Sequence, residues 1–216
     1  MKKAFVLALI TAAFVLTPSI ARSEGFVGAY LGFNLPDDAD AADISGFGAP
    51  TASLDMDPGI GLGLHGGMWF DKQNLPYLGL LLDYDIRVSN ISAVKYPAIT
   101  FPAEAGFVVA SFTANAALRL PEGKVKPYAG IGFGFASAVI DDGYVTVIGV
   151  PIYMTGDDDT SSITQLFLGI DIELTEIASM FFEIKRSSAD FEFQGDWWID
   201  MEYKSTQIYG GVNLRF

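Results

Sequence analysis

The stretch Gln207-Ile208-Tyr209-Gly210-Gly211-Val212-Asn213-Leu214-Arg215-Phe216 closes the sequence. Every second residue in it is apolar or small, and the residues between them are mostly polar. Successive side chains of a β-strand point to opposite faces, so this alternation predicts one apolar and one polar face. A strand that has lipid on one side and a polar interior on the other shows this pattern.

The first residues have the composition of an export signal. Lys2 and Lys3 form a basic region, and residues 4–16 form an apolar one. Small residues at Ala21 and Ser23 offer two cleavage sites, one after each. The pattern predicts a signal peptide, residues 1–23, that is removed. The alternative is a retained transmembrane helix, which is disfavoured because the apolar region is shorter than the roughly 20 residues that a span requires.

The composition excludes several kinds of protein. Cleavage after Ser23 would leave 10 of the 13 Lys and Arg residues against 26 Asp and Glu, a net charge of −16. Nucleic acid is therefore not an expected partner, because binding it requires a basic surface. The chain has no cysteine, so it has neither disulfides nor thiolate metal sites. Neither a metal nor a cofactor is expected.

The period-2 alternation recurs eight times, most clearly where Leu78, Leu80 and Leu82 alternate with Gly79, Leu81 and Asp83. The predicted strands cover about 24–34, 59–70, 77–88, 105–120, 127–140, 162–174, a segment that starts near 180, and the closing run. Their connections alternate between short (71–76, 121–126, 175–179) and long (34–58, 89–104, 141–161, 190–203). Short periplasmic turns and long outer loops are typical of outer-membrane barrels. The sequence therefore predicts an all-β fold, an eight-stranded antiparallel transmembrane β-barrel over residues 24–216, in the outer membrane.

Two glycine strings, Gly59-Ile60-Gly61-Leu62-Gly63 and Gly130-Ile131-Gly132-Phe133-Gly134, continue the strand alternation. A nucleotide-binding fingerprint would need a helix after the glycines, and neither string is followed by one. We expect the inward glycines to make room for large interior neighbours such as Tyr30 and Phe167, because eight strands enclose a narrow space.

Aromatic residues near predicted strand ends suggest the two girdles at which such barrels meet the membrane surfaces. The expected interface aromatics are Trp69, Tyr77, Tyr128, Trp197 and Trp198. The alternative interpretation is that they are ordinary strand-end core residues.

Several segments resemble a known family. Residues 115–121 and 126–134, NAALRLP and KPYAGIGFG, are similar to a hairpin of the small OmpA-like and OmpX-like outer-membrane β-barrel proteins. The opening FVGAYLG at residues 26–32 and the closing strand are similar as well. The resemblance implies an exported, porin-like barrel whose last strand carries the assembly signal for the barrel-assembly machinery, here Tyr209, Val212, Leu214 and Phe216. Barrels of this kind serve as anchors, adhesins, weak pores or enzymes, so the fold does not select a function.

The predicted interior carries many charges: Asp83, Asp85, Arg87, Arg119, Asp171, Glu173, Glu183, Lys185 and Arg215. Charges in a narrow interior are costly unless they are paired, so we expect a network of ion pairs that plugs the barrel. A symmetric turn at 175–179 would place Asp171 opposite Glu183, with Lys185, Arg119 or Arg215 between them. A charge-lined conducting path is the alternative.

His65 is the only histidine, and the strand order places it near Asp83, with Ser111 across from that carboxylate. These residue types occur in hydrolases, and some outer-membrane barrels modify lipid A. The order is unsuitable, because the base has to lie between the nucleophile and the acid that orients it. We therefore expect His65 and Ser111 to be polar lining of the interior.

The predicted outer loops are acidic, with Asp37, Asp38, Asp40 and Asp43 in the first and Asp157, Asp158 and Asp159 in the third. They match no calcium loop, so a solvated acidic surface is expected; divalent cations that bridge it to anionic lipopolysaccharide are a further hypothesis. The expected role is structural or surface interaction by a monomer in outer-membrane lipid and lipopolysaccharide, with an unknown extracellular partner. A narrow channel for ions or small solutes is the first alternative, and a lipid-modifying enzyme the second.

Overall fold

The computed structural model describes residues 23–43, 52–70, 77–194 and 199–216. It has strands β1 (Glu24–Pro36), β2 (Ala39–Asp43), β3 (Ala52–Trp69), β4 (Leu78–Tyr96), β5 (Ile99–Arg119), β6 (Val125–Ile140), β7 (Gly143–Val147), β8 (Val150–Met154), β9 (Asp157–Glu173), β10 (Ala178–Phe193) and β11 (Ile199–Arg215). In the described part of the chain, no helix has the length and apolarity to cross a membrane. The predicted signal peptide lies outside the described residues, apart from Ser23.

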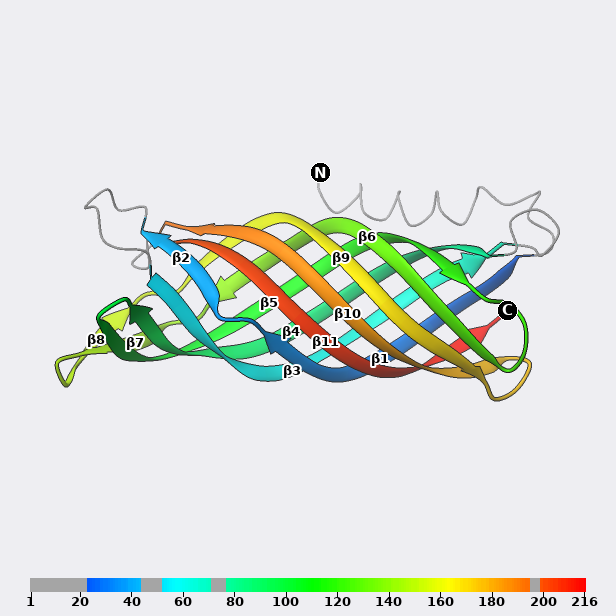
Figure 1. Ribbon diagram of the computed structural model, residues 1–216, viewed down its shortest axis with the longest axis horizontal. Helices are drawn as coiled ribbons and strands as arrows, with labels where there is room; N and C mark the ends of the chain where they lie inside the picture. Colours follow the sequence, from blue (N-terminus) through cyan, green and yellow to red (C-terminus); the bar gives the residue numbers. More distant parts are fainter. Residues whose placement is uncertain (1–22, 44–51, 71–76, 195–198) are drawn as a thin grey trace.

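Eight of these strands form a closed barrel. They pair antiparallel in the order β1, β3, β4, β5, β6, β9, β10 and β11. The pairing of β1 with β11, which sets Tyr30 opposite Gly211, closes the ring. Figure 1 shows the tilted strands wound around one long axis. The eight-stranded antiparallel barrel is confirmed, with the short strands β2, β7 and β8 added at one end.

Both β1 and β11 have one end at the same end of the barrel, which we call the terminal end. There the backbone N–H of Gly25 donates to the Phe216 carbonyl at 3.0 Å, and the Phe216 N–H donates back to Gly25 at 2.9 Å. Outward apolar side chains begin at this end, with Leu214 and Phe216 exposed, and continue along every barrel strand. This band is the surface that faces lipid.

The strands continue well past the band at the opposite end, which we call the outer end (left in Figure 1). β4 has 19 residues and β5 has 21, whereas about 9–11 residues cross the hydrocarbon core of a bilayer. Since barrels of this kind keep short turns on the periplasmic side and extend outside the cell, the outer end projects from the membrane surface.

The prediction of four long outer loops is wrong in extent. β4 and β5 meet at a turn within residues 97–98, β7 and β8 form a hairpin inside 141–161, and β10 and β11 run into 190–203. Polarity is inverted here: Phe191 and Phe193 are fully buried inside, and Asp190 and Glu192 are exposed outside. A pattern search that expects apolar residues on the outside takes such segments for loops.

The inward side chains of the outer end pack into one cluster, which we call the outer apolar core. It consists of Ala39, Leu54, Met56, Ile91, Ala103, Ala105, Phe107, Val109, Ala136, Ala138, Ile140, Ile163, Ala189, Phe191, Phe193, Ile199, Met201 and Tyr203. Every barrel strand except β1 contributes to it. The outer end is therefore built like a water-soluble barrel, with polar residues outside and apolar residues inside.

Glycines on the inner face make room for aromatic rings, as expected. A Cβ atom on Gly63 would collide with the Tyr30 ring, and one on Gly130 would collide with the Phe167 ring. The Tyr209 hydroxyl covers Gly61 in the same way. The glycine strings are thus explained by packing in a narrow interior.

The outer apolar core predicts a large cost for truncating its side chains. Phe191→Ala is expected to lower the free energy of unfolding by about 3–5 kcal/mol, because it leaves a cavity in a close-packed cluster. Asp190→Ala, on the outward neighbour, is the matched control and should change it by less than about 0.5 kcal/mol. Urea unfolding of the barrel refolded in phospholipid vesicles measures both, and equal effects would contradict the assignment of inner and outer faces.

Candidate functional site

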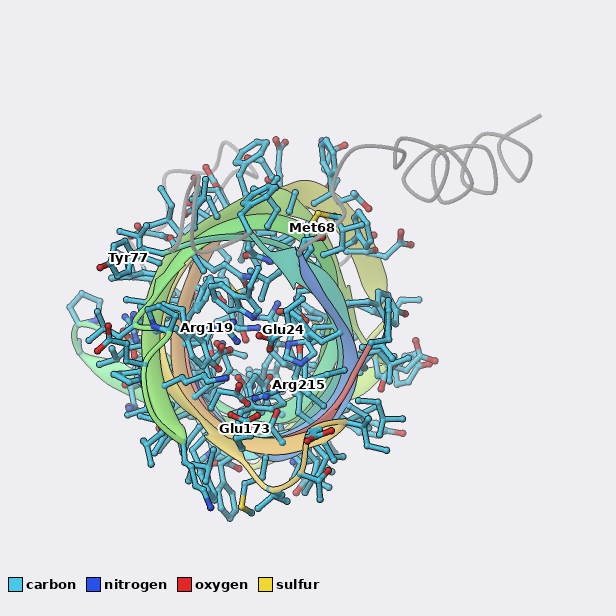
Figure 2. All side chains as sticks on the ribbon, turned by 90° about the vertical axis from the view of Figure 1, so that its right-hand side faces the viewer. Glu24, Met68, Tyr77, Arg119, Glu173 and Arg215 are labelled. Carbon is cyan, nitrogen blue, oxygen red and sulfur yellow. The ribbon has the colours of Figure 1, made fainter. Side chains whose placement is uncertain are left out.

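The interior of the membrane-embedded half is the candidate site, and its first layer lies at the terminal end. Arg119 donates two hydrogen bonds to Glu24, at 3.0 and 2.8 Å. Arg215 reaches Asp171 at 2.6 Å and Glu173 at 3.2 Å. Figure 2, which looks into this end, shows Glu24, Arg119, Glu173 and Arg215 inside the ring and Met68 and Tyr77 outside it. Two arginines thus hold three carboxylates across the opening.

Aromatic rings lie beside this layer. The Arg119 guanidinium stacks over the Trp69 ring, 4.3 Å from its centroid. Trp69 in turn stacks on Phe26, with centroids 6.3 Å apart, and lies 6.1 Å from Tyr128. All three rings are buried, so they narrow the opening that the ion pairs span.

A second charged layer lies deeper, around Lys185. Its ammonium group forms an ion pair with Asp83 and lies 3.6 Å from Glu183 and 3.9 Å from Asp85. The Tyr30 hydroxyl donates to Asp83, and the Tyr128 hydroxyl donates to Glu183 at 3.0 Å. One buried ammonium thus serves three carboxylates, which remain tolerable in the interior because hydroxyl donors share their charge.

The same layer continues through Arg87 and the uncharged polar side chains. Arg87 Nε lies 3.0 Å from Asp85, and the Ser111 hydroxyl donates to the same carboxylate at 2.8 Å. The Gln165 side-chain amide donates to Asn115 and to the Thr113 hydroxyl. These side chains come from β4, β5 and β9, so hydrogen bonds run across the interior as well as along its wall.

The nine predicted interior charges all lie on the inner face, and only Glu173 is partly exposed. The expected pairing of Asp171 with Glu183 is wrong: Asp171 lies opposite Phe181, and Glu183 lies opposite Gly169. Two of the cations proposed as bridges pair instead with separate carboxylates, Arg215 with Asp171 and Lys185 with Glu183.

His65 and Ser111 do not come together. His65 lies opposite Asp83, as expected, but its Nε2 contacts the Asn213 side chain at 2.7 Å. Ser111 lies opposite Asp85, not Asp83, because the β4–β5 register differs by two residues from the expected one. The two side chains bind different partners, so the geometry forms no nucleophile and base pair with His65.

The girdle prediction is wrong for Trp69 and Tyr128, whose side chains are buried inside the barrel. Tyr77 is half exposed on the outer surface, and Trp197 and Trp198 lie outside the described residues. In the last strand, Val212, Leu214 and Phe216 face outward, whereas Tyr209 is buried on the inner face. The strand therefore presents only three of the four predicted assembly residues to lipid.

Sequence reasoning missed Glu24, Phe26 and Asn213 as interior residues. Each has the same parity as a recognised inward position: Glu24 and Phe26 share the inner face with Tyr30, and Asn213 shares it with Arg215. Strict application of the two-residue period from strand centre to strand end would have identified them.

The Lys185 layer predicts that removal of the central cation is costly. Lys185→Met should lower the free energy of unfolding by about 3–5 kcal/mol, because it leaves buried carboxylates without a cation. Adding Asp83→Asn should recover part of that loss, and Lys124→Met in an exposed turn is the control. A double variant that is no more stable than Lys185→Met alone in urea unfolding would contradict the pairing of Lys185 with Asp83.

Comparisons with known proteins agree with this architecture. Residues 5–216 match the family described as outer membrane protein beta-barrel domain. A comparison with curated protein sequences finds no match.

Three solved structures illustrate the likeness. Neisserial surface protein A is 16% identical, with a TM-score of 0.50, and the alignment covers 89% of this chain and 97% of that one. Outer membrane protein OprG from Pseudomonas aeruginosa is 16% identical, with a TM-score of 0.52 and coverages of 90% and 97%. Outer membrane protease OmpT from Escherichia coli is 9% identical, with a TM-score of 0.58 and coverages of 93% and 99%. These identities show a shared fold alone. From the match over residues 5–216, the chain belongs to the outer membrane protein β-barrel domain family and is a protein of the outer membrane.

Proposed function

We propose that this protein is a non-conducting barrel that anchors its outer end at the cell surface and presents it for contact with other molecules. The observation that carries this proposal is the outer apolar core. Phe107, Ile140, Ile163, Phe191 and Tyr203 are almost fully buried there and come from five different strands. Their side chains meet across the interior, so an ion that crossed the barrel would have to pass through a packed apolar cluster.

The charged layers support the same conclusion. Buried charges that line a conducting path need water or permeant ions around them, whereas Asp83, Lys185 and Arg119 have protein partners at ion-pair distance. Opening a path would separate these pairs in a low-dielectric interior, which is costly. The polar inner face of the embedded half is therefore better suited to hold the wall rigid than to carry solutes.

The described surface of the outer end carries more carboxylates than cations, and Asp57, Asp190, Glu192 and Asp200 are among its exposed acidic residues. Among its described ion pairs, Lys95 lies between Asp38 and Asp55, Arg186 binds Asp37, and Lys204 binds Glu202. The hydrogen bond from Arg186 holds the pKa of the Asp37 carboxyl below its usual range, so Asp37 is anionic at neutral pH. The described residues contain no group of three or more His, Cys, Asp or Glu arranged to hold a metal ion. A solvated anionic surface, which favours cationic partners, fits these observations.

The outward face of the last strand and the lipid around the barrel bear on assembly. We infer that Val212, Leu214 and Phe216 form the recognition face for the barrel-assembly machinery, since all three are exposed on the last strand. We also infer that the protein is a monomer in outer-membrane lipid and lipopolysaccharide. No catalytic step is proposed: OmpT is a protease by its name, but a likeness at 9% identity concerns the fold.

Single-channel recording in planar bilayers tests the proposal. The refolded protein should give no current steps above noise, because the outer apolar core blocks the interior. A variant that thins this core, with Phe107, Phe191 and Tyr203 all replaced by alanine, should show either steps or increased noise if it remains folded. Reproducible steps from the unmodified protein would favour the narrow channel instead and would make the interior charges its functional site.

A further inference from the structure

The hairpin of β7 and β8 presents apolar side chains to water at the outer end. Ile148 at its tip is 91% exposed, Val150 is 61% exposed and Ile152 is 47% exposed. β7 pairs with β5 at Ala103 and Glu104, and Val145 and Met154 pack against the outer apolar core, so the hairpin base is fixed to the barrel. A rigid support therefore holds an apolar tip outside the membrane band.

The turn itself is an unusual place for an apolar residue. Val147 pairs with Val150, and the two residues between them, Ile148 and Gly149, have φ values of 51° and 77°. Two-residue turns with positive φ at both positions favour Asn or Gly in the first, and a β-branched residue is strained there. Such strain persists when something else requires the residue, and here the feature that an asparagine would lack is the exposed apolar side chain.

The base of the hairpin is anionic. A hollow of about 440 Å³ is lined by Val139, Ile140, Gly156 and the aspartates 141, 142, 157 and 158. The Tyr153 hydroxyl and the Gly156 N–H donate to Asp142 and hold the pKa of its carboxyl below the usual range. Within the described chain, no ion pair involves Asp141, Asp142 or Asp158. The hairpin thus has an apolar tip, and the carboxylates at its base are not neutralised by protein cations.

We propose that this hairpin is a docking site for a polypeptide that carries both apolar and basic side chains. Apolar side chains of the partner cover Ile148, Val150 and Ile152, and its Lys or Arg side chains reach the carboxylates at the base. The inference rests on the proposed function, because it requires the outer end to be presented at the cell surface.

Two other occupants fit the observations less well. A second copy of this chain would bring two acidic outer ends together, and like charges repel. A lipid bilayer would accept the apolar tip, but it would offer the aspartates no cationic partner unless its headgroups were cationic. A basic, apolar polypeptide is the occupant that satisfies both the tip and the base.

Methyl NMR on the barrel in phosphatidylcholine nanodiscs tests the docking. Isoleucine methyl groups are labelled with ¹³C, and a ten-residue peptide of alternating leucine and lysine is titrated. The Ile148 and Ile152 methyl signals should shift in a saturable way, and the Ile177 signal should not, because Ile177 lies in an exposed turn at the terminal end. A peptide of alternating leucine and glutamate is the charge-reversed control and should cause no saturable shift.

Two variants assign the contacts. Ile148→Asn introduces a residue that the turn favours, so the hairpin remains folded. The substitution should weaken peptide binding about tenfold or more, because apolar contact is lost. The double variant Asp142→Asn, Asp158→Asn should weaken binding severalfold and reduce its dependence on salt. Ile177→Asn, at the opposite end, should leave the affinity unchanged.

The outcomes separate this inference from the proposed function. Equal binding of both peptides, unmoved Ile148 methyl signals, or shifts caused by added phosphatidylcholine vesicles in place of the peptide would overturn the docking site. Each of these results can occur without current steps in bilayers, so none of them contradicts the non-conducting barrel. Current steps would instead contradict the non-conducting barrel, whatever the response of Ile148.

Discussion

Every backbone N–H and C=O group of a chain in the lipid core has to find its partner within the protein. This structure meets that constraint by pairing β1 with β11 over residues 26–36 and 205–215, which closes an eight-stranded ring. Closure determines which way each side chain points, because alternate residues of a strand have to face either lipid or the enclosed interior. Both the packing of the interior and the apolar outer surface follow from this single pairing.

The solvent outside the ring changes along the barrel axis, and the side-chain pattern changes with it. In the membrane band the outward positions are apolar, for example Leu166 and Leu168, and the interior is lined by charged, polar and aromatic side chains. At the outer end the outward positions are polar, and the interior contains the outer apolar core. The strands stay continuous across the boundary, because hydrogen bonding between strands does not depend on which face is apolar. One sheet therefore serves as a membrane anchor below and as a water-soluble support above.

Much of this fold is predictable from the sequence. The period-2 runs, such as residues 78–88, specify strands, and their even number specifies a closed antiparallel ring with both chain ends together. The same parity places Asp83, Lys185 and Arg119 in the interior. The glycines opposite Tyr30 and Phe167 follow from the limited volume that eight strands enclose.

Other features depend on distances that a single sequence does not contain. Trp69 and Tyr128 have the inward parity, but their positions near turns suggested a membrane girdle. The ion-pair partners of Asp171 depend on strand register, and so does the position of Ser111 opposite Asp85. A register difference of two residues changes the partner of a side chain but keeps it on the same face of the sheet. The sequence pattern overestimates the length of the outer loops, because the apolar and polar faces of the strands exchange places beyond the membrane.

A packed apolar core closes the interior of the outer end, and chemical labelling of single cysteines tests this closure directly. The chain has no cysteine, so single cysteines can be introduced and labelled without background. Ala138 is fully buried on the inner face, and Ser162 is exposed on the outer face of the neighbouring strand β9. A water-soluble methanethiosulfonate reagent should modify Ser162→Cys rapidly and leave Ala138→Cys unmodified in the folded barrel. Similar labelling rates at the two positions would show that water reaches the interior and would contradict the closed core.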